Sequence, residues 1–168
     1  HYSPRKIDDD FSKDVFKEYL KALDPEKNIF FQSDIDALRV YETKLDDEIH
    51  GEAILFQPAT SVIYEKRVIE ARKVFENVIQ SPFDFSIDDS VLLDVDVKLA
   101  PANENDRFTY WHQILKYKTL DRFVNLTEER EKNKTKEKFV IKADSTLERE
   151  ARASVKKEYL KRFERLEK

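Results

Sequence analysis

The fold of this chain is decided by residues 11–35, which read FSKDVFKEYLKALDPEKNIFFQSDI. The apolar residues of the first half recur at helical spacings and predict one buried stripe: Phe11, Val15, Phe16, Tyr19, Leu20 and Leu23. Asp24-Pro25 is expected to end this helix, because proline cannot donate an amide and its ring clashes with the preceding turn. An extended lead-in through residue 7, with Pro4 in it, precedes the helix, and one of Asp8, Asp9 and Asp10 is predicted to cap it.

The second half of the stretch predicts another helix. Ser33 with Asp36 three residues on is typical of an N-cap and capping box. We expect this helix to run from about Asp34 to Ile49 and to end at Gly51, which takes a left-handed conformation freely. Its buried stripe would be Ile35, Leu38, Tyr41 or Leu45, and Ile49. The two helices then form a hairpin whose short loop points Phe30 and Phe31 inward.

The ordered string within this hairpin resembles the N-terminal helical domain of tail-specific proteases, also called carboxy-terminal processing proteases. The residues that carry the resemblance are Phe16, Tyr19, Leu20, Leu23, Asp24, Pro25, Phe30, Phe31, Ser33, Asp34 and Ile35. The likeness continues more weakly through Tyr41, Leu45-Asp46-Asp47, Phe83-Asp84-Phe85 and Trp111. A generic helical hairpin would need only the apolar stripe, without this order of residues.

The resemblance implies a function for the parent protein. Members of the family are bacterial envelope serine endopeptidases that recognise unstructured, apolar C-termini through a PDZ domain and cleave in the periplasm. They use a serine with a lysine as general base. The resemblance therefore predicts PDZ and protease domains of the same chain beyond Lys168 and polypeptide substrates. It makes residues 1–168 a single helical N-terminal domain. The start at His1 rather than Met also indicates a piece of a longer chain with a leader removed.

The composition favours helices. The chain has 168 residues, 40% hydrophobic and 39% charged, with one glycine, which disfavours a sandwich, a barrel or a nucleotide-binding loop. We predict a mainly all-α fold, an orthogonal or antiparallel bundle of about five helices. The net charge of −4 gives no case for nucleic acid, and the basic end is interleaved with glutamates as in a solvated helix face. No apolar run approaches the ~20 residues of a membrane span.

Three further helices are predicted from periodicity. One ends near Gln80, with Pro58 in its first turn or, if the helix already begins near Glu52, at a kink. The next runs from Asn103–Asp106 to about Val124, with Trp111 as a core anchor or, alternatively, a stacking surface for a ligand. After a charged loop or helix end, the last begins with a capping box at Ser145 and Glu148 and either docks on the hairpin or continues past Lys168. Its stripe is Leu147, Ala151, Val155, Tyr159, Phe163 and Leu166.

Residues 83–106 have a different pattern. Apolar and polar residues alternate from Val91 to Leu99, which predicts an extended acidic segment, with a two-stranded ribbon against residues 138–144 as one option. The aspartates Asp88, Asp89, Asp94 and Asp96 raise the alternative of a calcium site, but the glycine and glutamate of an EF-hand loop are missing.

The sequence predicts no catalytic, metal-binding or cofactor-binding residue. His1, His50 and His112 lie in no HExxH pattern, and the absence of Cys excludes disulfides and thiol catalysis. Ser154 and Lys157 match S-x-x-K, which chance explains in a lysine-rich chain. A metal site at Asp8-Asp9-Asp10 is less favoured than capping, because adjacent aspartates on a starting helix point in different directions.

Two hypotheses for function remain open at this point. The first is a non-catalytic scaffold that gates substrate in a periplasmic, cell-envelope tail-specific protease. The second is a free-standing helical module that binds a partner protein through an exposed apolar groove. The gene sequence after Lys168 discriminates between them.

Overall fold

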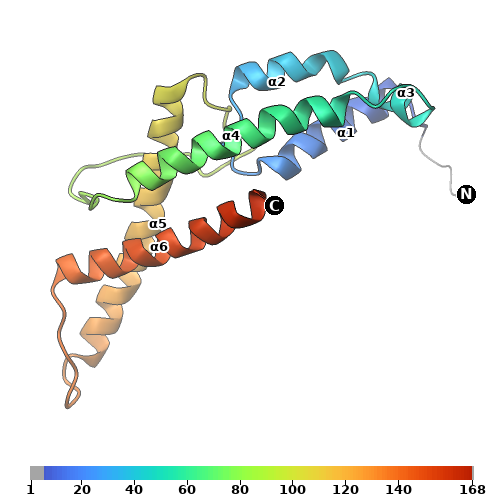
Figure 1. The fold of residues 1–168 in the computed structure, drawn as a ribbon. Helices are drawn as coiled ribbons and strands as arrows, with labels where there is room; N and C mark the ends of the chain where they lie inside the picture. Colours follow the sequence, from blue (N-terminus) through green and yellow to red (C-terminus); the bar gives the residue numbers. More distant parts are fainter. Residues whose placement is uncertain (1–5, 168) are drawn as a thin grey trace, which may run out of the picture. The chain divides into compact units, whose positions relative to one another are not determined.

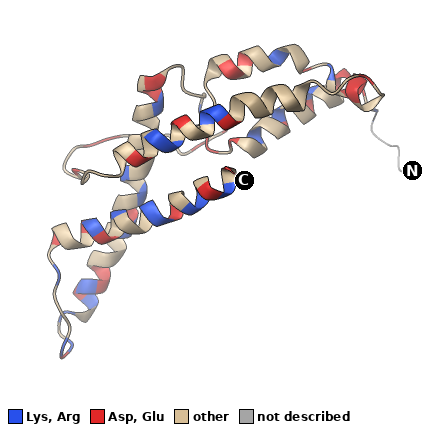
Figure 2. Ribbon diagram, in the orientation of Figure 1, with Lys and Arg blue, Asp and Glu red and all other residues tan. Residues whose placement is uncertain are grey.

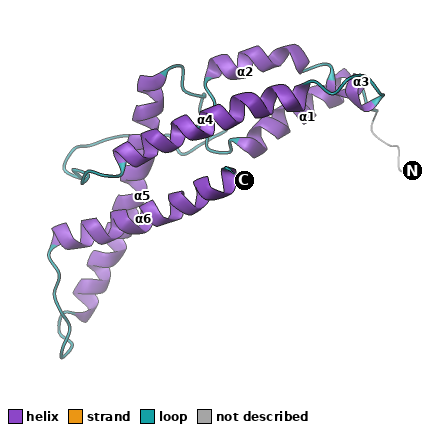
Figure 3. Cartoon of the chain, in the orientation of Figure 1, coloured by secondary structure: helices purple, strands orange, loops and turns teal. Residues whose placement is uncertain are grey.

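The structure is a computed structural model that describes residues 6–167, and within this range it contains six α-helices, one 3₁₀ turn and no strand (Figures 1 and 3). The elements are α1 (Asp9–Leu23), α2 (Gln32–Leu38), η1 (Arg39–Tyr41), α3 (Leu45–Ile49), α4 (Phe56–Val78), α5 (Glu104–Asn133) and α6 (Asp144–Leu166). The predicted mainly all-α class is confirmed. The expected lead-in lies, as far as Arg5, outside the described residues, as does any continuation of α6 past Glu167.

The described residues form two compact units. The first contains the chain up to Glu70 together with Leu92–Asp106, and the second contains Ala71–Val91 together with the chain from Arg107 onward. The boundary falls within α4, between Glu70 and Ala71. Each unit has its own set of buried side chains, so each is described by itself.

Helix α1 begins and ends as the sequence predicts. The Asp8 carboxylate accepts a hydrogen bond from the Phe11 N–H at 3.2 Å, which makes Asp8 the N-cap. Asp9 and Asp10 lie in the first turn, where the helix dipole favours negative charge. The helix ends at Leu23, directly before Asp24-Pro25, and buries Phe16 and Leu20.

The predicted second helix is wrong in its start and in its continuity. Helix α2 begins at Gln32 and is capped at Phe31, whose N–H donates to the Asp34 carboxylate at 2.8 Å, so Ser33 lies inside the first turn. The helix ends at Leu38, and η1 and α3 follow as separate elements. A contact with a residue distant in sequence replaces the helical ladder at the start of α3, because the Leu45 N–H donates to the buried Ser12 hydroxyl at 2.7 Å. Gly51 follows α3 with a φ of +113°, as expected.

The second unit is organised around an aromatic cluster. Phe75 of α4 lies 6.0 Å from Trp111 of α5, 5.6 Å from Tyr159 and 5.5 Å from Phe163 of α6, measured between ring centroids. Trp111 is fully buried, so the prediction of a core anchor is confirmed. The stripe of α6 packs on α4 and α5 within this unit, and Leu166 is half-buried.

Two boundaries in the second unit differ from the prediction. Helix α5 continues to Asn133, nine residues past the expected end, because its last turns consist of strong helix formers with a pair such as Glu128–Lys132. Figure 2 shows acidic and basic residues interleaved along this part. Helix α6 is capped at Ala143 rather than at Ser145. Glu148 turns instead toward Arg152, with 2.9 Å between Oε1 and Nε.

The option of a two-stranded ribbon is wrong, because neither segment is a strand. The Asp94 carboxylate accepts the Asp96 N–H at 3.0 Å and the Asp94 carbonyl accepts the Lys98 N–H at 3.1 Å, which forms a turn. An aspartate side chain that bonds the backbone two residues on competes with ladder pairing. The other segment begins at Lys138, whose φ of +68° also places it in a turn.

Truncation of Phe75 tests the aromatic cluster. We expect Phe75→Ala to lower the free energy of unfolding of the second unit by about 3–5 kcal/mol, because it leaves a cavity beside Trp111. Denaturant titration followed by tryptophan fluorescence reports this unit selectively, since Trp111 is the only tryptophan. The matched control is Tyr117→Ala, an aromatic side chain exposed on α5, for which we expect less than about 1 kcal/mol. Equal effects of the two substitutions would contradict this account of the core.

Candidate functional site

The residues between 16 and 35 that carry the resemblance contribute much of the core of the first unit. Asp24 shows how: its carboxylate is 5% exposed and accepts backbone N–H bonds from Asn28 at 3.0 Å, Ile29 at 2.9 Å and Phe30 at 3.0 Å. The Asp24 N–H also donates to the Leu20 carbonyl at 3.0 Å, which closes α1. One side chain therefore ends the first helix and shapes the loop that carries Phe30 inward.

Asp34 plays the corresponding part at the start of α2. Its carboxylate caps Phe31 and also binds Arg67 of α4 at two points, with 2.8 Å to Nε and 2.9 Å to the terminal nitrogen. The hydrogen bond to Asp34 raises the pKa of the Arg67 guanidinium above its ordinary value. The same guanidinium lies 4.4 Å above the centre of the Phe31 ring. Asp34 thus fastens the hairpin to α4.

The core of this unit is an apolar cluster. Its buried members are Phe16, Leu20, Phe30, Leu38, Leu45 and Phe56, with Tyr19, Leu23 and Ile35 partly buried against them. The ring centroids of Phe16 and Tyr19 lie 5.4 and 5.2 Å from that of Phe56. The Tyr64 hydroxyl donates a hydrogen bond to the Leu23 carbonyl at 3.1 Å. Among the residues that carry the resemblance, only Pro25 and Ser33 are exposed.

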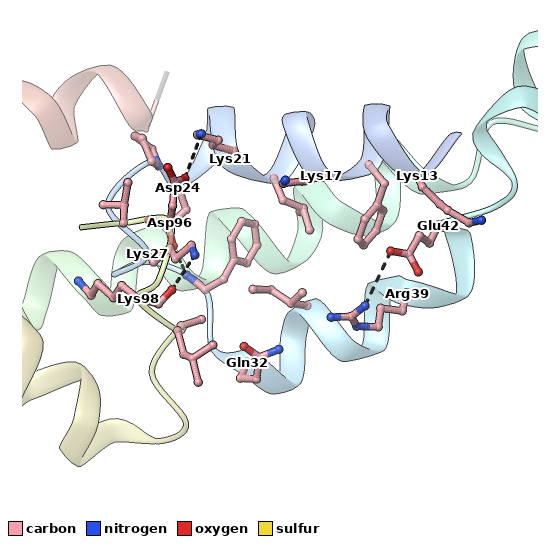
Figure 4. Close-up of a pocket in the computed structure, with 18 of the residues that line it drawn as sticks. Lys13, Lys17, Lys21, Asp24, Lys27, Gln32, Arg39, Glu42, Asp96 and Lys98 are labelled. Carbon is pink, nitrogen blue, oxygen red and sulfur yellow. Dashed lines mark hydrogen bonds and ion pairs between the residues drawn. The ribbon is translucent and has the colours of Figure 1, made fainter. Parts of the chain in front are cut away.

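An open groove runs along this hairpin (Figure 4). It has a volume of about 750 Å³ and lies between α1, α2 and the segment 95–100. Apolar side chains line it from all three elements: Phe16, Leu20, Phe30, Ile35, Val95, Leu99 and Ala100. The groove is therefore a surface continuation of the hairpin core, built in part by residues that carry the resemblance: Phe16, Leu20, Phe30 and Ile35.

The groove is bordered by more cations than anions, although the chain as a whole is acidic. The six cations are Lys13, Lys17, Lys21, Lys27, Arg39 and Lys98, and the four anions are Asp14, Asp24, Glu42 and Asp96. Asp24 is buried beneath backbone N–H groups, so the open part of the groove is basic. An apolar floor with a basic border is suited to a ligand that combines apolar groups with carboxylates.

Several border cations already hold partners. Lys21 lies 3.4 Å from an Asp96 oxygen, Arg39 lies 3.8 Å from Glu42, and the Lys27 ammonium donates to the Lys98 carbonyl at 2.6 Å. The Lys98 ammonium donates to the Glu26 carbonyl at 2.9 Å, and burial lowers its pKa below the ordinary value. Lys17 makes no ion pair with any residue of the range 6–167.

Three residues considered in the sequence as possible site residues, Ser154, His112 and Asp89, contact other side chains of the chain. The Ser154 hydroxyl accepts from Arg122 at 2.7 Å, and His112 packs against the rings of Phe83 and Phe108. Asp89 pairs with Lys116 at 2.5 Å. Among residues 6–167 there is no cluster of three or more His, Asp or Glu side chains arranged to hold a metal ion. No helix in that range has the length and apolarity to cross a membrane.

The position of the groove was not predicted from the sequence. A signal was available, because Lys13, Lys17 and Lys21 follow one another at intervals of four and so share one face of α1. What the sequence does not give is the distance between that face, α2 and the segment 95–100, which depends on the loop that Asp24 shapes.

Comparison with known proteins gives one consistent result. The family model described as "Tail specific protease N-terminal domain" matches residues 1–166. The chain is also similar to the tail-specific protease of Haemophilus influenzae, with 35% identity over 120 residues. The match covers 69% of this chain and 17% of that relative, so the chain corresponds to a small part of the longer protein.

Substitution of Asp24 tests the account of the hairpin. We expect Asp24→Ala to lower the melting temperature of the first unit by about 12 °C or more, since three buried N–H groups lose their acceptor at about 1–3 kcal/mol each. Thermal unfolding followed by far-UV circular dichroism measures this shift. The control is Glu18→Ala, an exposed carboxylate on α1. A melting temperature within 2 or 3 °C (roughly the spread of surface substitutions) for Asp24→Ala would show that the carboxylate is dispensable.

Proposed function

The chain belongs to the family of tail-specific protease N-terminal domains, and from this premise we propose that it is a non-catalytic scaffold that gates substrate in a serine protease. The parent enzyme would degrade proteins from unstructured C-termini, in the periplasm. The proposal treats residues 1–168 as one N-terminal domain followed in the same chain by PDZ and protease domains, which would supply the serine and its lysine base.

The observation that carries the proposal is the set of hydrogen bonds made by the two buried aspartates of the string, Asp24 and Asp34. Asp24 accepts three backbone N–H bonds, and Asp34 accepts one and pairs with Arg67 at two points. Carboxylates engaged in this way hold a structure together, because their oxygen atoms are already occupied. The hydrogen bonds of this string therefore support a structural role for the domain.

The groove supports the gating part of the proposal. It is open, about 750 Å³ in volume and lined by residues from both arms of the hairpin, so a polypeptide that entered it would contact α1 and α2 together. A domain that holds part of an unfolded substrate beside a protease raises the local concentration of that substrate at the catalytic centre. Folded proteins lack extended segments for such a groove, and this difference gives a physical basis for selecting unstructured ones.

The groove also gives the second hypothesis a specific basis, since a free-standing interaction module would use the same surface. The two hypotheses differ in what the gene encodes after residue 168. A PDZ segment followed by a serine-lysine protease supports the scaffold, and a stop codon supports the free-standing module.

Removal of residues 1–168 from the intact protein tests the gating role. We expect the truncated enzyme to retain cleavage of a short unstructured peptide and to lose at least tenfold in kcat/KM on a long unfolded polypeptide, because the effective concentration supplied by the groove is lost. Unchanged cleavage rates and unchanged substrate choice would contradict the proposal.

A second variant keeps this test decisive if the truncated enzyme does not fold. The intact protein with Asp24→Ala, assayed above the melting temperature of its first unit and below that of the rest, loses the hairpin alone. Glu18→Ala at the same temperature is the matched control. The same loss on the long polypeptide, with the short peptide unaffected, is expected only of Asp24→Ala.

A further inference from the structure

We propose that the groove binds an extended polypeptide segment in which apolar side chains alternate with carboxylates. This inference deepens the gating role and rests on it in one respect, namely that the bound polypeptide is a substrate of the parent enzyme. Three features of the groove support the binding: its dimensions, its charges and the segment of the chain that lies at its edge.

The dimensions suit a short length of extended chain. Lys13 and Lys21 are eight positions apart on α1, which at a rise of 1.5 Å per residue is about 12 Å. An extended chain rises by about 3.3 Å per residue, so about four residues fit along this face. In an extended chain every second side chain points the same way, which places two apolar side chains on the floor formed by Phe16, Leu20 and Ile35.

The charges of the border select for carboxylates. The cations of α1 are spaced one turn apart along the groove, at Lys13, Lys17 and Lys21, so they match a ligand whose negative charges are also distributed along its length. An anionic amphiphile carries its charge at one end and does not match this spacing. Lys17 has no ion pair within the described residues, which leaves its ammonium available for a ligand.

The existing ion pairs are weak enough to exchange. Lys13 pairs with Asp10 and Lys21 with Asp96 at 3.2 and 3.4 Å, and the two carboxylates are 85% and 79% exposed. Pairs as exposed as these contribute little to stability, because water and salt screen them. A ligand carboxylate can therefore replace either partner without unfolding the hairpin.

The chain itself shows which chemistry the groove accepts. The segment 95–100 lines the groove with the apolar side chains of Val95 and Leu99. Figure 4 shows Asp96 and Lys98 of the same segment. From the same segment the Asp96 carboxylate pairs with Lys21, and the Lys98 carbonyl accepts from the Lys27 ammonium. Two lysines thus bind a carboxylate and a peptide carbonyl of a turn whose apolar side chains also line the groove. The open remainder of the groove has the same floor and the same border.

Peptide binding to the intact protein tests the proposal. The probe is a fluorescein-labelled heptapeptide, VLLDVDV, with the sequence of residues 91–97 and an amidated C-terminus, so that recognition of a free carboxyl-terminal tail does not contribute. Fluorescence anisotropy gives the Kd, and mass spectrometry confirms that the probe stays intact. We expect saturable binding that weakens with salt, and at least tenfold weaker binding of VLLKVKV, in which both aspartates are replaced.

Variants locate the binding in the groove. We expect Lys17→Glu to raise the Kd for VLLDVDV at least tenfold, and Leu99→Ser, which removes an apolar side chain that is 71% exposed in the groove, to raise it about threefold. The matched control is Lys66→Glu, an exposed lysine of α4 outside the groove, for which the Kd should be unchanged. Far-UV circular dichroism of each variant verifies that the helices are retained.

Several results would overturn the inference. They are the absence of saturable binding, equal affinity for VLLDVDV and VLLKVKV, equal effects of Lys17→Glu and Lys66→Glu, and displacement of the probe by dodecanoate at concentrations below its micelle formation. The last result would assign the groove to an anionic amphiphile. Because Kd is measured without any cleavage, the two failures are distinguishable. Unchanged cleavage after deletion of residues 1–168 contradicts the gating role and leaves the Kd values as they are, whereas the absence of saturable binding contradicts the groove as a peptide site.

Discussion

The first unit depends on one buried carboxylate. Asp24 binds three successive backbone N–H groups of the loop that follows α1, and without an acceptor those groups would be buried and unpaired. The loop in turn directs Phe30 into the apolar cluster and places Asp34 where it caps α2 and pairs with Arg67. A helix end, a loop and the attachment of α4 therefore follow from the position of a single side chain.

This dependence gives the string of residues 16–35 a structural role. The string specifies a hairpin, and the hairpin presents a surface. Its apolar side chains are shared between the interior and the floor of the groove, where Phe16, Leu20 and Phe30 belong to both. The groove is then a consequence of the same packing that stabilises the unit, with cations along its border. Substitutions that weaken the hairpin would change the groove as well.

The sequence predicts best where one local signal decides the structure. The end of α1 follows from Asp24-Pro25, the burial of Trp111 from its place on an apolar stripe, and the buried face of α6 from intervals of four residues. It fails where a side chain competes locally with the backbone ladder, as Asp94 does in the alternating segment. It also fails where a distant partner intervenes, as at Leu45, whose N–H donates to the Ser12 hydroxyl. The groove belongs to this last class, because three elements distant in sequence form it.

The most direct measurement of the central claim is amide hydrogen exchange of residues 28–30 in the unmodified protein. These residues lie outside any helix, and the amide hydrogens of an ordinary surface loop exchange quickly with solvent. If the Asp24 carboxylate holds them as described, the amides of Asn28, Ile29 and Phe30 will exchange as slowly as those in the middle of α1 and will be released together with them on unfolding. Exchange of these three amides at the rate of exposed loop amides, with α1 still protected, would contradict the account.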